Sequence, residues 1–148
     1  MKKIIEMIET MSKIEETRLF FKKILGMDEI CIGGSAALLC EYNIYLDRPI
    51  HDIDVILSQG QFDGVLSSLS ALAKYFDFKR KKGSSCYKGK DGKIRQKSAA
   101  FVLKDGLEIN ILVGKHPEGQ WQSIQEIINA KMRYGRPKDL RDLAIIFW

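Results

Sequence analysis

The chain is 148 residues long and 45% hydrophobic, which suits one domain with a single core and argues against a second domain. Its formal net charge of +5 favours an acidic partner without naming one. Three cysteines form no CxxC pair and cannot all close into disulfides, so we expect reduced thiols in a cytoplasmic protein rather than a disulfide scaffold.

The first 25 residues show the pattern of an amphipathic helix. Apolar residues from Ile4 to Leu25 recur at roughly helical spacing between charges, and Gly26 follows as a stop. We expect an opening helix over 2–25 with a break near Ser12. Glutamates interrupt its apolar positions, so we expect neither a signal peptide nor a membrane span.

A strand, a tight turn and a helix are predicted next. An apolar run over 29–32 ends in two glycines, and the helix formers after them place Ser35 where its hydroxyl can cap a first turn. "DIDVIL", 52–57, alternates and then becomes purely apolar, which is typical of a strand that enters a covered sheet. Helical spacing returns over 60–76.

A basic arm occupies residues 79–97. It contains nine Lys or Arg against one acid, Asp91, so it carries +8 and leaves −3 for the rest of the chain. Such closely packed like charges repel unless an anion lies near them. The arm is either a solvated loop or a segment that binds a phosphate-bearing partner such as RNA, with its tyrosine stacked on a base. The residues expected to make this contact are Lys81, Lys82, Tyr87, Lys88 and Lys90.

The last third predicts a hairpin followed by two helices. Lys104-Asp105-Gly106 lies between two β-prone runs within 98–114, and the glycine can take a positive φ. Helical patterns over 121–134 and 136–148 are separated by Gly135, and Pro137 stands near the start of the second.

Carboxylates occur on two of the predicted strands. Residues two apart in a strand point to the same side, so Asp52 and Asp54 project together and repel unless a cation shares them. Hard oxygen ligands of this kind suit Mg²⁺. Glu108 is an acid within a core-like strand, and Asn110 faces the same side. The alternative is that these residues are solvated groups on an exposed sheet face.

The glycines of "GGS", 33–35, allow a backbone to approach a ligand closely, and the N–H groups of the helix that follows attract phosphate. A tight turn explains these three residues equally well. The ordered combination is more specific, because 16 residues separate "GGS" from "DID", and a strand with an acid between two apolar residues comes later.

This combination resembles the nucleotidyltransferase superfamily that includes DNA polymerase beta. The resemblance is closest to its small prokaryotic members, the AbiEii-like and minimal nucleotidyltransferases, in which a strand-GG[ST]-helix precedes R-x-[ST]-x-D-[IL]-D. Arg48, Asp52 and Asp54 match this pattern, whereas Ile50 stands where a Ser or Thr is usual and removes a hydroxyl near the site.

The C-terminal "KMRYGRPKDLRDL", 131–143, is similar to the closing signature of the family. That signature is a lysine followed by a basic–Asp pair and a second Asp on a helix. The matching residues are Lys131, Lys138, Asp139 and Asp142, although the gap after the first lysine is shorter than usual in AbiEii proteins.

The resemblance implies an α+β fold, with a nucleotidyltransferase-like mixed β-sheet, helices packed on one side and a helical C-terminus. We expect a single domain over 1–148, with a catalytic core over 29–113 and C-terminal helices over 121–148. The implied activity moves a nucleoside monophosphate from an NTP such as ATP to a hydroxyl of RNA, protein or a small molecule, and releases pyrophosphate.

The resemblance also implies roles for individual residues. Asp52 and Asp54 would share two Mg²⁺ ions, or Mn²⁺, and Glu108 would complete the metal site and help to activate the acceptor. The residues expected to bind the nucleotide are Gly33, Gly34, Ser35, Arg48, Lys131 and Lys138. On a helix, either lysine could equally be a surface cation paired with an acid. His51 alternates away from the aspartates, so we assign it no catalytic role.

Two other functions stay open from the sequence. One is a degenerate relative that binds a nucleotide or a partner protein without turnover, and the other is an unrelated α+β RNA-binding module. The basic arm favours a phosphate-bearing acceptor such as tRNA over a polycationic aminoglycoside. Because no separate acceptor domain is evident, we expect a partner protein or a homodimer to complete the site.

Overall fold

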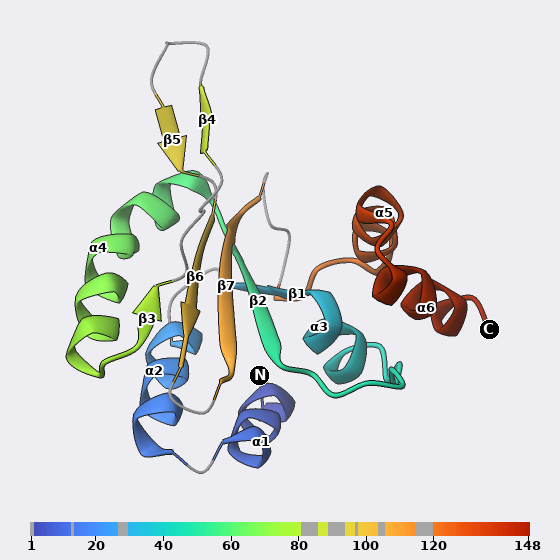
Figure 1. The fold of residues 1–148 in the computed structure, drawn as a ribbon, viewed down its shortest axis with the longest axis horizontal. Helices are drawn as coiled ribbons and strands as arrows, with labels where there is room; N and C mark the ends of the chain where they lie inside the picture. Colours follow the sequence, from blue (N-terminus) through green and yellow to red (C-terminus); the bar gives the residue numbers. More distant parts are fainter. Residues whose placement is uncertain are drawn as a thin grey trace.

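A computed structural model shows a mixed α+β fold (Figure 1). It describes residues 2–12, 14–26, 30–80, 86–88, 94–96, 98–103, 106–114 and 120–148. The helices are α1 (Lys2–Met11), α2 (Glu15–Leu25), α3 (Gly34–Cys40), α4 (Gln59–Tyr75), α5 (Ile124–Tyr134) and α6 (Pro137–Ile146). The strands are β1 (Cys31–Gly33), β2 (Asp52–Leu57), β3 (Lys79–Arg80), β4 (Cys86–Lys88), β5 (Ile94–Gln96), β6 (Ser98–Val102) and β7 (Glu108–Val113).

Within these described ranges, five strands form one sheet in the order β1-β2-β7-β6-β3. Strand β2 is antiparallel to β1 and parallel to β7, and the pairs β7–β6 and β6–β3 are antiparallel. The sheet is therefore mixed, as the sequence predicts. Strands β4 and β5 pair with each other in a separate antiparallel ladder.

Alternating burial along β2 and β7 gives the sheet one apolar face and one polar face. Ile53, Val55 and Leu57 of β2 are fully buried, as are Ile109 and Ile111 of β7. They join one core cluster with buried side chains of α1, α2, α3 and α4. The residues between them on each strand, including the acids, therefore lie on the opposite face.

Several predicted local features are confirmed. The opening helix is broken at Ser12, whose Oγ accepts a hydrogen bond from the Ile14 N–H at 3.2 Å. Strands β6 and β7 pair as the predicted hairpin, with Gly106 at a φ of +82°. Gly135 adopts a left-handed conformation with a φ of +59°, which ends α5, and Pro137 is the first residue of α6.

The prediction that Ser35 caps α3 is wrong. The helix begins at Gly34, the N-cap residue is Gly33, and no side chain caps the turn. Gly33 instead pairs with Asp54 in the β1–β2 ladder, so β1 extends to residue 33 and the helix starts directly after it. Ser35 lies in the first turn, where its hydroxyl accepts a hydrogen bond from Arg48.

A second apolar cluster docks the C-terminal helices onto α3. Its buried members are Ala37, Leu38 and Ile127, and partly buried side chains from both C-terminal helices surround them. Figure 1 shows α5 and α6 beside the β1 edge of the sheet and α4 beside the β3 edge. This docking brings the "KDLRD" segment, 138–142, close to "GGS".

Most of the basic arm lies outside the described residues. Lys79 and Arg80 form β3 and are exposed. Lys81, Lys82 and Lys90 are among the residues not described, and so are the side chains of Tyr87 and Lys88 in β4. None of the helices that the structure describes is long and apolar enough to cross a membrane.

Candidate functional site

Three adjacent strands bring the predicted acids and glycines to one face of the sheet. In the parallel β2–β7 pair, Asp52 lies opposite Glu108 and Asp54 lies opposite Asn110. In the antiparallel β1–β2 pair, Asp54 also lies opposite Gly33. Residues that are directly opposite in neighbouring strands point to the same face. The sequence analysis identifies these acids as candidate site residues. The strand pairing shows that they lie beside the glycine turn.

Asn110 connects the two aspartates. Its Nδ2 donates one hydrogen bond to Asp52 Oδ2 at 3.0 Å and another to Asp54 Oδ1 at 3.1 Å. The two carboxylates are thus held by a neutral amide that supplies hydrogen bonds but no positive charge. The sequence places Asn110 on the same side as Glu108 but does not show this contact, because the contact depends on which strands pair.

The surroundings of Asp54 disfavour its ionised form. Burial raises its pKa, and the neighbouring Asp52 carboxylate raises it further. The Asn110 hydrogen bond and the positive charges of Lys131 and Lys138 act in the opposite direction without cancelling the increase. A cation at this position would favour the charged form of both carboxylates.

The glycine turn lies directly against Asp54. Gly34 has a φ of +60°, and a methyl group built on it would overlap Asp54 Oδ2. Its backbone N–H donates to Gln122 Oε1 at 3.0 Å. Gln122 lies in the segment before α5, which runs beside β1 through an isolated bridge between Trp121 and Ile32. No periodic pattern in the sequence marks Gln122 as a contact of the turn.

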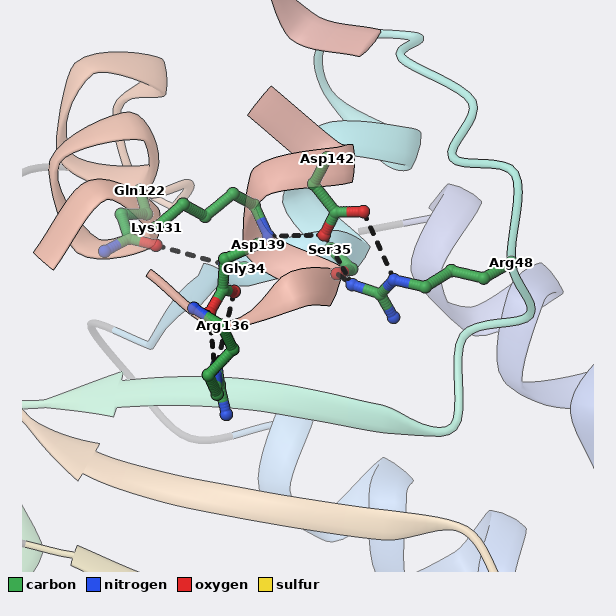
Figure 2. Close-up of polar contacts among 8 residues, drawn as sticks. All are labelled: Gly34, Ser35, Arg48, Gln122, Lys131, Arg136, Asp139 and Asp142. Atoms are coloured by element: carbon green, nitrogen blue, oxygen red, sulfur yellow. Dashed lines mark hydrogen bonds and ion pairs between the residues drawn. The ribbon is translucent and has the colours of Figure 1, made fainter. Parts of the chain in front are cut away.

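A network of charged side chains lies beside α3 and is centred on Asp142 (Figure 2). Arg48 donates to both of its carboxylate oxygens, from Nη2 at 2.6 Å and from Nε at 3.2 Å. Lys131 Nζ donates to Asp142 Oδ2 at 2.8 Å. Arg48 Nη2 also donates to Ser35 Oγ at 3.2 Å. The network thus joins α3, the segment before β2, α5 and α6.

The two cations keep Asp142 ionised despite its burial. Burial alone would raise the pKa of this carboxyl, but the hydrogen bonds from Arg48 and Lys131, together with their charges, lower it below its usual range. The pKa of Arg48 is raised, mainly by its hydrogen bond to Asp142, and the Asp52 charge contributes as well. Asp142 and Arg48 are therefore both charged at neutral pH.

Asp139 is also buried but has a different partner. It accepts hydrogen bonds from the Arg136 backbone N–H at 3.1 Å and from Arg136 Nε at 2.7 Å, which fixes the start of α6. Burial opposes ionisation, but the Arg136 hydrogen bonds outweigh it and lower the pKa of Asp139. Lys138 is half-buried beside it. Asp139 is therefore a helix-capping residue, whereas Asp142 connects distant elements.

Paired carboxylates fit a hard divalent cation, which proteins often hold with one or two carboxylates and the phosphates of a substrate. The raised pKa of Asp54 fits a cation too, because a positive charge nearby would offset both the burial of this carboxyl and its repulsion from Asp52. In the described part of the chain, no group of three His, Cys, Asp or Glu side chains is arranged to hold a metal ion. Glu108 lies opposite Asp52 in register, and its role as a third ligand stays a prediction.

The remaining predicted positions are less closely connected to the acids. His51 is exposed, and its backbone carbonyl accepts a hydrogen bond from the Glu108 N–H at 2.9 Å. Ile50 is half-buried. Lys131, which the sequence leaves open as a surface cation, is buried at 7% exposure and paired with Asp142.

Comparisons of the chain with models of protein families, with curated proteins and with solved structures find no match.

Proposed function

We propose that the protein is a metal-dependent nucleotidyltransferase. The observation that carries this proposal is the convergence of Gly33, Asp52 and Asp54 on one face of two adjacent strands, β1 and β2. A glycine turn beside paired carboxylates suits a triphosphate and its cation. The ordered motifs of the sequence support the same function.

In the proposed reaction, an acceptor hydroxyl attacks the α-phosphorus of an NTP. A new P–O bond forms, the bond between the α-phosphorus and the oxygen that bridges it to the β-phosphate breaks, and pyrophosphate departs while the hydroxyl proton passes to solvent. When bound, Mg²⁺ lowers the pKa of the attacking hydroxyl and neutralises charge on the leaving group. We assign the binding of that cation to Asp52 and Asp54, with Glu108 beside them.

The cationic groups would act on the substrate phosphates. Arg48 is 24% exposed at its side chain, and its Nη2 lies 3.2 Å from Ser35 Oγ. The positive charges of Lys131 and Lys138 reach Asp54, since both lower its pKa. We propose that these three residues neutralise the triphosphate while Gly34 allows its close approach.

For the acceptor we propose an RNA such as tRNA, bound in part by the basic arm. The support is the concentration of charge in 79–97, since neutralising phosphates with Lys and Arg is the main source of affinity for nucleic acids. A partner protein or a second copy of the chain would complete the acceptor site.

A second candidate is a protein that binds a nucleotide without turning it over. It is favoured by Asn110, whose neutral amide already satisfies both aspartates, and by Ile50 at the position of the usual hydroxyl residue. In this candidate the same face binds the Mg²⁺–NTP complex but does not activate an acceptor.

One experiment separates these functions. The protein is incubated with each α-labelled NTP, Mg²⁺ and total tRNA or cell lysate, with Asp54→Ala in parallel. Transfer of label that Asp54→Ala abolishes supports the nucleotidyltransferase. Binding of Mg²⁺–NTP without transfer supports the second candidate, and the absence of any nucleotide binding leaves an RNA-binding module.

A further inference from the structure

Asp142 is a fully buried carboxylate that pairs with two cations. Its side chain is 0% exposed, whereas those of Lys131 and Arg48 are 9% and 24% exposed. One cation would suffice to neutralise the carboxylate. The second leaves an excess of one positive charge in this part of the site.

The geometry of Arg48 is fixed by two neighbouring side chains. Its Nη2 and Nε hold the Asp142 carboxylate, and Nη2 also reaches Ser35 Oγ. Figure 2 shows Arg48 and Lys131 approaching Asp142 from opposite sides. A carboxylate that accepts hydrogen bonds from both cations sets their orientation. A guanidinium and a carboxylate form paired hydrogen bonds in only a few planar arrangements.

The two cations lie close to the glycine turn and the acid pair beside it. Arg48 Nη2 donates to Ser35 Oγ at 3.2 Å, and the neighbouring Gly34 lies directly against Asp54. Lys131 donates to the same Asp142 oxygen as Arg48 Nη2 does. An anion bound beside the glycine turn would therefore meet both cations and the cation-binding acids together. A polyphosphate bound with a divalent cation carries charges of both signs and fits this arrangement.

We propose that Asp142 is a positioning residue that fixes Arg48 and Lys131 as an oriented pair of cations for the triphosphate of the substrate. This inference rests on the proposed function, because the triphosphate is that of the NTP. Asp142 itself does not touch the substrate. It acts through the two cations that it orients.

The test compares Asp142→Asn with Asp139→Asn. Both residues are buried aspartates on α6, one helical turn apart, and both variants raise the net charge by one. The probe is inorganic tripolyphosphate with Mg²⁺, measured by titration calorimetry, which needs neither a base nor an acceptor. Thermal unfolding of each variant is recorded alongside.

The two explanations of Asp142 predict opposite signs. If only the net charge mattered, Asp142→Asn would bind tripolyphosphate as well as Asp139→Asn does, or more tightly than the wild type, at a temperature where the unfolding curves show both variants to be folded. If Asp142 positions the cations, its variant binds roughly tenfold more weakly, because the cations no longer donate well-aligned hydrogen bonds to the phosphates, while Asp139→Asn stays close to wild type. Equal affinities for the two variants, or no binding by the wild type, would overturn the proposal.

If Asp142→Asn does not fold, Arg48→Lys tests whether the orientation of the cation matters for binding. This variant keeps the positive charge but loses the planar guanidinium that donates to both Asp142 and Ser35. Weaker tripolyphosphate binding supports positioning, and unchanged binding overturns it. Transfer of α-label is assayed separately on the same proteins. If tripolyphosphate binding depends on Asp142 but no label is transferred, positioning stands and nucleotidyl transfer is wrong.

Discussion

Asn110 on β7 and Asp54 on β2 lie opposite each other in parallel register, and the Asn110 amide donates a hydrogen bond to the Asp54 carboxylate at 3.1 Å. The same amide nitrogen also reaches Asp52. Two carboxylates that would otherwise repel thus share one hydrogen-bond donor. This arrangement gives the two carboxylates a defined geometry. Substitutions that change the charge at Asn110 or Asp54 therefore test how that geometry affects metal binding and stability.

Asn110→Asp should strengthen metal binding. The substitution replaces the bridging amide with a third carboxylate, so the metal-free protein should lose about 1–3 kcal/mol at neutral pH, because a hydrogen bond is removed and a charge is left unpaired. Mn²⁺ or Mg²⁺ should then raise its melting temperature more than that of the wild type. Asn129→Asp, an exposed change on α5, is the matched control and should respond to metal as the wild type does.

Asp54→Asn should stabilise the metal-free protein at neutral pH. The folded-state pKa of Asp54 is raised, chiefly by burial and then by Asp52, so its ionised form opposes folding. The gain should shrink as the pH falls through the raised folded-state pKa and vanish below the unfolded pKa of about 3.9, where the wild-type carboxyl is protonated in both states. Denaturant titrations between about pH 7.5 and 3 measure this, and a loss of stability at neutral pH would contradict it.

Asp142→Asn should have the opposite effect. The folded-state pKa of Asp142 is lowered because its hydrogen bonds from Arg48 and Lys131 outweigh its burial, so the wild-type carboxylate stabilises the fold above the unfolded pKa. Removing this buried partner should cost about 3–5 kcal/mol at neutral pH. The difference from wild type should diminish below about pH 4, as the wild-type carboxyl becomes protonated. Chemical denaturation as a function of pH checks the sign.

Gly34→Ala should damage the site directly. The added methyl would overlap Asp54 Oδ2, and the φ of +60° is unfavourable for alanine, so a loss of about 1–3 kcal/mol is expected together with weaker tripolyphosphate binding. Gly64→Ala is the control, because a methyl there meets nothing within 4 Å on α4. It should gain about 0.5–1 kcal/mol from helix propensity. Thermal unfolding distinguishes the two, and equal effects would show that the turn tolerates a side chain.

Neutralising the basic arm should weaken RNA binding. Replacing Lys81, Lys82, Lys88 and Lys90 with Gln removes four charges, so the affinity for tRNA and the slope of its salt dependence should both fall, the slope by roughly one for each phosphate that the arm no longer neutralises. The control replaces Lys2, Lys3, Lys22 and Lys23, which gives the same net charge. Filter binding at several salt concentrations measures both. An affinity equal to that of the control would remove the arm from the acceptor site.

Helices and strands could be predicted from the sequence where the pattern that marks them spans only a few residues. Alternation in 52–57 identifies both the strand and the shared face of Asp52 and Asp54, and Gly135 with Pro137 marks the boundary between two helices. These patterns depend on neighbours within a few residues, so the chain itself contains the information.

Contacts between distant elements could not be predicted in the same way. The sequence identifies Asp142 as part of a motif on a helix but not as a buried residue, because its burial depends on how α6 packs near α3. Asn110 bridges the aspartates only because β7 pairs in parallel with β2. Ser35 has the sequence position of a cap, yet the ladder through Gly33 sets the helix start and leaves its hydroxyl for Arg48.

The most direct test of nucleotidyl transfer compares two labels of one NTP. The protein is incubated with Mg²⁺, total tRNA and the NTP labelled either at the α- or at the γ-phosphate, with Asp52→Asn and Asp54→Asn in parallel. We predict that the α-label joins the acceptor, the γ-label is released as pyrophosphate, and both variants lose the reaction. Transfer of the γ-label, or undiminished α-label transfer by the variants, would contradict the proposed function.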